Sequence, residues 1–133
     1  MRNYKNYEAG IENEVQERWG DTSAYREHKH KTKNYTRDKW TEANNGLMVI
    51  FADFAACKQS GSDADSNEAQ ALVAKLQAHI TANYYTCTDE ILAGLGKMYV
   101  ADERFKKNID KYAEGTAEFA SEAITMFYKL RIL

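Results

Sequence analysis

Three features of this 133-residue chain predict an all-α fold. The chain contains no proline, its apolar residues recur with the helical period, and glycines and short polar clusters separate the periodic segments. A chain of this length is long enough for one domain with a sizeable core. Helix packed on helix is the architecture that this pattern favours.

The first forty residues carry little apolar surface. A helix over about 4–18 has a narrow apolar stripe that continues to Trp19, and a second helix over about 23–34 has Tyr25 as its only large apolar residue. A helix this polar is marginal on its own. We therefore expect residues 1–40 to dock weakly on a helical core of residues 41–133.

Polar residues that can accept a hydrogen bond from the first helical turn mark the starts of the remaining helices. They are Thr36, Ser66, either Thr88 or Thr86, and Asp102; Thr116 begins the last helix. The first of these helices should run to about residue 58, and the polar stretch 59–66 is the clearest loop.

Glycines interrupt two of the predicted helices. The run Asn44-Asn45-Gly46 is expected to bend or break the long helix that starts after Thr36. Gly94 and Gly96 lower helix propensity but permit close approach of another helix or of a ligand.

Bulk composition argues against several functions. A net charge of −2 offers no electrostatic footprint for nucleic acid, and no apolar run has the length of a membrane span or a signal peptide. Cys57 and Cys87 fit neither a disulfide framework nor a four-ligand metal site. We expect a cytoplasmic domain with no cofactor, no metal and no enzymatic activity.

The nine tyrosines, five phenylalanines and two tryptophans have two interpretations. They can form a wall against which a ligand stacks, or they can simply fill the core and the helix seams. Composition alone favours core packing.

The histidines give weak signals. His28 and His30 are two positions apart on a polar helix and point in different directions, so we expect both to be solvated. His79 lies beside an apolar helix face, where a packed histidine is more common than a haem or metal ligand.

Cys87 lies just before a predicted helix N-terminus, where the helix dipole favours the thiolate. It could act as a nucleophile toward an electrophilic ligand or be a small buried residue, and the sequence favours neither. For Cys57, near the end of an apolar helix, a packed thiol is sufficient.

Several segments in order resemble the TipAS antibiotic-recognition domain, the C-terminal half of some MerR-type regulators. The first is Glu17-Arg18-Trp19-Gly20-Asp21-Thr22-Ser23-Ala24-Tyr25-Arg26, followed by the stretch from Tyr35 to Trp40. More specific are Ala78-His79-Ile80 through Tyr84-Tyr85-Thr86-Cys87-Thr88 and then Gly94-Leu95-Gly96-Lys97-Met98-Tyr99-Val100-Ala101-Asp102, with Arg104-Phe105 after it. The resemblance covers about residue 11 to the C-terminal helix.

The resemblance implies a globin-like helical fold without haem, in which an N-terminal segment closes over a drug bound in an aromatic cleft. It also implies a thiopeptide or another large polycyclic antibiotic as ligand, and Cys87 matches the position that can add to a dehydroalanine of the drug. The DNA-binding module and coiled coil usual in such regulators do not precede this sequence. It is therefore either a fragment of a longer, homodimeric regulator or a stand-alone form.

We accordingly predict an antibiotic sensor domain of a MerR-type transcriptional activator; the alternative is a stand-alone drug-sequestering protein. The predicted ligand-binding residues of the lid and its edge are Trp19, Tyr25, Tyr35 and Trp40. Those of the cleft are Phe54, His79, Tyr84, Met98, Tyr99 and Phe105, with Cys87 as an optional covalent anchor.

Overall fold

A computed structural model of the chain describes residues 23–132, which form six α-helices and no strand. The helices are α2 (Ser23–Thr32), α3 (Arg37–Gln59), α4 (Asn67–Asn83), α5 (Asp89–Ala101), α6 (Glu103–Asp110) and α7 (Thr116–Ile132). The predicted all-α fold is confirmed. The predicted helix over 4–18 and Trp19 lie outside the described residues.

Side-chain caps begin four of the helices where the sequence predicts them. Thr36 accepts a hydrogen bond from the backbone of Lys39 at 3.1 Å, and the remaining three caps repeat this role at the start of α4, α5 and α6. These three caps are Ser66, Thr88 and Asp102. Each cap satisfies a backbone N–H that the first turn leaves without a partner.

Helix α3 runs unbroken through Asn44-Asn45-Gly46, so the predicted break is wrong. Packing outweighs propensity here, because Ala43 and Ile50 on either side of this run are buried in the core. Gly46 has a packing role instead. A Cβ at this position would lie 2.5 Å from Cε1 of His79 on α4, so glycine permits α4 to approach.

The core lies among α3, α4, α5 and α7. Phe51, Leu76 and Ile124 are among its fully buried side chains. Helices α5 and α7 meet at Gly96, where a Cβ would be 3.0 Å from Ile124, which confirms the close helix approach predicted for this glycine. Nothing lies within 4 Å of a Cβ placed at Gly94.

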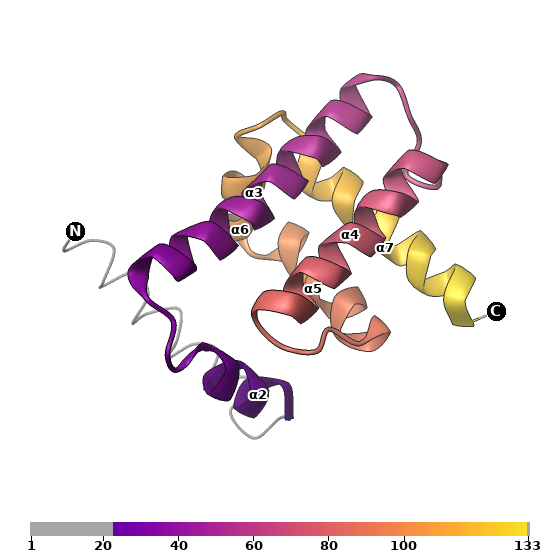
Figure 1. Cartoon of the computed structure of the whole chain (residues 1–133). Helices are drawn as coiled ribbons and strands as arrows, with labels where there is room; N and C mark the ends of the chain where they lie inside the picture. The colour runs from indigo at the N-terminus through magenta and orange to yellow at the C-terminus, as the bar shows by residue number, and fades with distance from the viewer. Residues whose placement is uncertain (1–22, 133) are drawn as a thin grey trace.

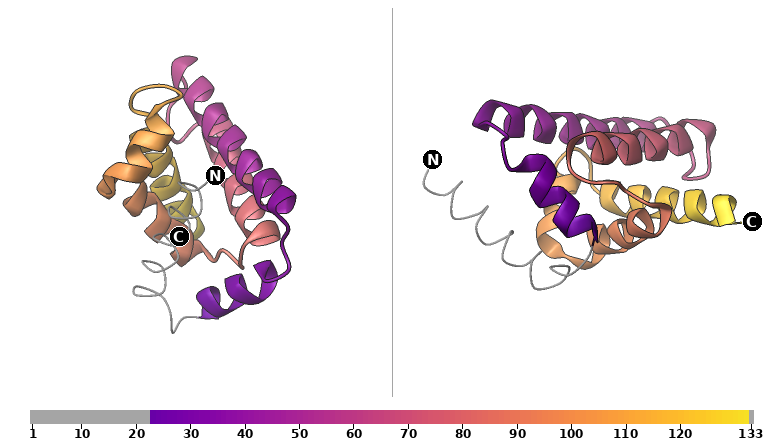
Figure 2. Two further views of the ribbon diagram at one scale, coloured as in Figure 1. Left: turned by 90° about the vertical axis from the view of Figure 1, so that its left-hand side faces the viewer. Right: turned by 60° about the horizontal axis from the view of Figure 1, so that its bottom comes forward.

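Helices α3 and α4 form an antiparallel pair joined by the loop 60–66 (Figure 1). Helix α2 lies at the opposite end of this pair, below the start of α3 and close to the connection between α4 and α5 (Figures 1 and 2). The segment 33–36 links α2 to α3. Among the described residues, no helix has the length and apolar character needed to cross a membrane.

Candidate functional site

Helix α2 buries one face against the rest of the molecule. Tyr25 and Thr32 are buried and His28 is half-buried; these positions are three, four and seven residues apart, as on one side of a helix. The ring of His28 packs among aromatic side chains, so its predicted solvated position is wrong. His30, on the opposite face, is exposed as predicted.

A row of rings lies beneath α2. Tyr35 meets Trp40 edge-on with centroids 5.4 Å apart, Trp40 lies 6.3 Å from Tyr84, and Tyr84 lies 6.1 Å from His79. We call these four residues the aromatic row. Four of the predicted site residues are therefore brought together, from α3, α4 and the segments beside them.

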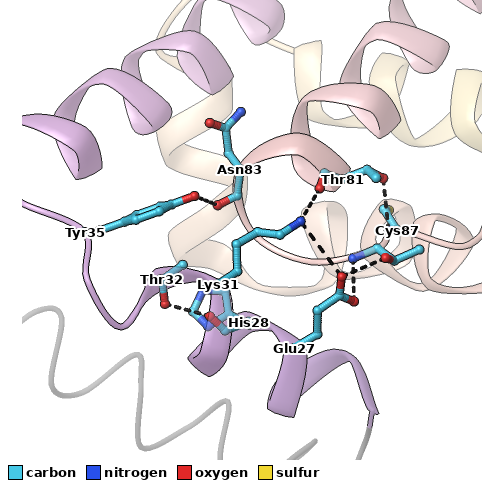
Figure 3. Close-up of polar contacts among 9 residues, drawn as sticks. Glu27, His28, Lys31, Thr32, Tyr35, Thr81, Asn83 and Cys87 are labelled. Atoms are coloured by element: carbon cyan, nitrogen blue, oxygen red, sulfur yellow. Dashed lines mark hydrogen bonds and ion pairs between the residues drawn. The ribbon is translucent and has the colours of Figure 1, made fainter.

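Polar side chains of α2 and the following segment hold this cover in place (Figure 3). The carboxylate of Glu27 accepts hydrogen bonds from the backbone N–H and the hydroxyl of Thr86, both at 2.8 Å. Lys31 donates to the carbonyl of Thr81 at 2.7 Å, and the hydroxyl of Tyr35 donates to the carbonyl of Asn83 at 2.5 Å. The two Thr86 bonds, with the charge of Lys31, hold the pKa of Glu27 below its ordinary value.

Tyr84 is fixed from the α3 side. Its hydroxyl donates to Oδ1 of Asn44 at 2.7 Å. Burial raises the pKa of Tyr84 to about 12, with a further contribution from the nearby phenol of Tyr35. The aromatic row thus has one member that is neutral and bonded to α3.

Both ring nitrogens of His79 have partners. Nε2 lies 2.8 Å from the carbonyl of Ala43, which can only accept, so Nε2 carries the proton. The amide of Asn83 lies 3.4 Å from Nδ1 and donates to it. This arrangement supports the packed histidine over a haem or metal ligand, and the described residues contain no group of three or more His, Cys, Asp and Glu that could hold a metal.

Cys87 is buried next to the contact between Glu27 and Thr86. Its N–H donates to the hydroxyl of Thr81 at 3.1 Å, and its carbonyl accepts from Gln77 at 2.9 Å. Burial raises the pKa of the Cys87 thiol to about 11, with a further contribution from the charge of Asp89. Of the two interpretations that the sequence left open, these contacts favour the small buried residue, since desolvation of the thiol opposes the effect of the helix dipole.

The other predicted cleft residues form a second group inside the bundle. Phe54 is fully buried between Phe51 and Phe119. Tyr99 meets Phe51 edge-on at 5.3 Å and Phe105 at 6.3 Å, while Met98 and Phe105 are half-buried against the core. Burial raises the pKa of Tyr99, with further contributions from the Tyr85, Cys87 and Tyr84 groups nearby.

Sequence reasoning missed several residues that hold α2 in place. They are Glu27, His28, Lys31, Asn83 and Tyr85. If histidine is treated as an aromatic residue, positions 25, 28 and 32 of the sequence indicate the buried face of α2. No local signal marks Glu27 or Lys31, because their partners lie about fifty or more residues away in the chain.

A shallow hollow of about 490 Å³ lies elsewhere, at the end of the α3–α4 pair near the loop 60–66. Cys57, Asp53 and Leu72 are among its lining residues. It contains none of the predicted site residues. Helix α2 contacts Trp40 and Tyr84 of the aromatic row through His28, so this hollow and the candidate site do not coincide.

Comparison with known proteins identifies the family of the chain. Residues 11–127 match the family model of the TipAS antibiotic-recognition domain. The chain belongs to the TipAS family.

Relatives of this TipAS domain are longer proteins. The chain is 40% identical over 113 residues to the HTH-type transcriptional activator TipA of Streptomyces coelicolor, covering 85% of this chain and 45% of that protein. It is 33% identical over 127 residues to the HTH-type transcriptional activator mta of Bacillus subtilis, covering 96% and 48%. The chain thus spans about half the length of the curated relatives it matches.

The fold of a solved TipAS structure is also similar. That structure, of nosiheptide in complex with TipAS, concerns a thiopeptide antibiotic multidrug resistance system from Streptomyces lividans. The TM-score is 0.82 at 37% identity, over 93% of this chain and 86% of that one.

Proposed function

We propose that this chain is the antibiotic-binding sensor domain of a MerR-type transcriptional activator. The observation that carries the proposal is the aromatic row beneath α2, a cover attached through the short segment 33–36. The family membership supports it, as does a similar TipAS domain solved with nosiheptide. The ligand class that we propose is therefore a thiopeptide or another large polycyclic antibiotic.

The proposed lid is residues 1–40 and the proposed core is residues 41–133. Since α3 already begins at Arg37, the pivot of the lid falls in the segment 33–36, and Trp40 forms the edge of the site. Opening breaks the Glu27, Lys31 and Tyr35 contacts and uncovers the aromatic row. Ligand that binds between lid and core then favours the closed arrangement by its differential affinity for the two states.

The proposed ligand contacts extend from the aromatic row into the bundle. They comprise the predicted residues Trp19, Tyr25, Tyr35, Trp40, His79, Tyr84, Met98, Tyr99 and Phe105, with Phe54 behind them. Large rigid rings supply apolar contact area at little cost in conformational entropy, which suits recognition of bulky ligands.

We keep Cys87 as an optional covalent anchor. The thiol would lose its proton to water, its sulfur would add to the β-carbon of a dehydroalanine, and the α-carbon would take one proton back from water. The raised pKa and the burial of Cys87 mean that this step requires the lid to open first. If a thiopeptide gives the same mass adduct with the Cys87→Ser variant, the anchor lies elsewhere.

The names of the relatives favour transcriptional sensing over drug sequestration by a stand-alone protein. The sensor proposal includes an N-terminal DNA-binding domain, a homodimeric regulator, a cytoplasmic location and no enzymatic activity of this domain.

A thermal-shift titration with nosiheptide tests the proposal. Binding to the folded state alone should stabilise it by about 2.7 kcal/mol at a hundredfold excess over the dissociation constant. Trp40→Ala, which removes one member of the aromatic row, should reduce this ligand-dependent shift, whereas Tyr128→Ala on α7 should retain it. Absence of any shift across nosiheptide and other large polycyclic antibiotics would rule out the proposed ligand class.

A further inference from the structure

Three side chains from three helices form a chain of hydrogen bonds beside the start of α5. The side-chain nitrogen of Gln77 on α4 donates to the carbonyl of Cys87 and to Oδ1 of Asp89, each at 2.9 Å. The other carboxylate oxygen of Asp89 accepts from Nε of Arg131 on α7 at 2.8 Å. The guanidinium of Arg131 also lies over the ring of Phe127, 5.1 Å from its centroid. Both donor positions of the Gln77 amide and both oxygens of Asp89 are therefore used.

This chain of bonds ends at the connection between α4 and α5, which α2 contacts. Cys87 is held to α4 through both of its main-chain groups: its carbonyl accepts from Gln77, and its N–H donates to the hydroxyl of Thr81 at 3.1 Å (Figure 3). The residue before it, Thr86, donates its N–H to Glu27 of α2 at 2.8 Å. Since Cys87 lies between the helices, side chains rather than a helical ladder place its main-chain groups.

We propose that Asp89 is a positioning residue for the docking of α2. By orienting the amide of Gln77, it keeps the connection 84–88 in the conformation that presents the N–H of Thr86 to α2. The docking of α2 is thereby coupled to the ion pair that Asp89 forms with Arg131 at the end of α7. That α2 covers a ligand site rests on the proposed function, but the coupling itself does not.

The end of α7 is then a second place from which the docking of α2 can be loosened or tightened. It is accessible, since Leu130 and Ile132 beside Arg131 are exposed. Coupling free energies are reciprocal, so an event that breaks the pair of Asp89 and Arg131 weakens the docking of α2, and docking strengthens the pair. The bonds from Arg131 and Gln77 also lower the pKa of Asp89, which keeps this carboxylate ionised in the network.

The pKa of the Glu27 carboxyl reports whether Thr86 is in place, because the two bonds from Thr86 lower it most. Carbon-13 NMR of the side-chain carboxyls measures this pKa, and the Glu27→Gln variant assigns the signal. In Asp89→Asn the pKa of Glu27 should rise toward its ordinary value of 4.5. A direct electrostatic effect has the opposite sign, since removal of a negative charge favours ionisation of Glu27.

A second variant and a control separate positioning from charge. Gln77→Met removes the donor hydrogens without changing the net charge, and it should also raise the pKa of Glu27. Glu90→Gln removes one negative charge from an exposed position in the same first turn of α5, and it should not raise this pKa. Because the pKa is measured in the folded protein, a mere loss of stability does not move it.

The end of α7 is tested by a matched pair of variants. Arg131→Gln should lower the amide protection of α2 about threefold to tenfold. Lys129→Gln removes the same charge from the same last turn of α7 and should leave the protection of α2 unchanged.

The outcomes separate this inference from the proposed function. An unchanged or lowered pKa of Glu27 in Asp89→Asn, or equal effects of Arg131→Gln and Lys129→Gln, overturns the coupling. If nosiheptide fails to bind while the pKa of Glu27 still rises in Asp89→Asn and not in Glu90→Gln, the coupling stands and the proposed function falls.

Discussion

Helix α2 and the bundle α3–α7 are held by different forces. The bundle packs fully buried apolar side chains such as Phe51, Leu76 and Ile124, each of which contributes about 1.5–3 kcal/mol by leaving water. Helix α2 depends instead on ring contacts and on a few hydrogen bonds through Glu27 and Lys31, for which water competes because they are exposed or only partly buried. The molecule therefore contains two units of unequal stability, and the weaker unit covers the candidate site.

The largest effect is expected inside the bundle, at Gly96. A methyl group at Gly96 would lie 3.0 Å from Ile124 of α7, so Gly96→Ala should lower the free energy of unfolding by about 1–3 kcal/mol through overpacking. Urea denaturation measures this loss. Gly94→Ala is the matched control: its methyl group meets nothing within 4 Å, and it should stabilise the same helix by up to about 1 kcal/mol. Equal effects of both changes would contradict the close packing of α5 on α7.

A smaller effect is expected at the contact between Gly46 of α3 and His79, the member of the aromatic row that lies on α4. Gly46→Ala should displace the His79 ring and break its bond to Ala43. Alanine improves helix propensity, but displacing the ring costs more, so the net destabilisation should be about 1 kcal/mol. In His79→Ala the same glycine change should become stabilising, because the clash is gone. A double-mutant cycle measures this change of sign, and additive effects would refute the contact.

The smallest effect on global stability is expected at Glu27, although its effect on α2 should be clear. Because the pKa of Glu27 is lowered in the folded state, its contribution is fully present above the ordinary value of 4.5 and is lost as the pH falls through the lowered pKa. The amide protection of α2, measured relative to the intrinsic exchange rate at each pH, should therefore fall under acid conditions before that of the bundle does.

Glu27→Gln should remove most of this acid dependence, since glutamine has no charge to lose. Glu42→Gln, at an exposed position on α3, should leave it unchanged. If the protection of α2 and of the bundle falls together in the parent protein, α2 and the bundle unfold as one cooperative unit and their stabilities do not differ.

Helix positions could be predicted from the sequence because they follow from local chemistry. The caps at Thr36, Ser66, Thr88 and Asp102 act within three residues of themselves, and the apolar period is visible in any short window. The error at Gly46 arose because propensity is local, whereas the reason for this glycine lies on α4.

The candidate site was predicted less completely. Tyr35, Trp40, His79 and Tyr84 do meet, but the residues that hold α2 were missed. They were missed because α2 is polar, and its buried face consists of a tyrosine, a histidine and a threonine. In addition, Glu27 and Lys31 bond to partners that only the tertiary fold brings near. The sequence left the two interpretations of Cys87 open for the same reason, since desolvation depends on what covers the thiol.

Side chains of α2 and of the segment 33–36 bond to main-chain groups of residues 81–86. Lys31 and Tyr35 bond to the carbonyls of Thr81 and Asn83, and Glu27 bonds to the backbone N–H of Thr86. Main-chain groups are the same whatever the residue, so mutations can accumulate at 81 and 83 without abolishing these bonds. Substitutions at these positions can therefore change the ligands that the domain recognises, while the hydrogen bonds that hold α2 are kept.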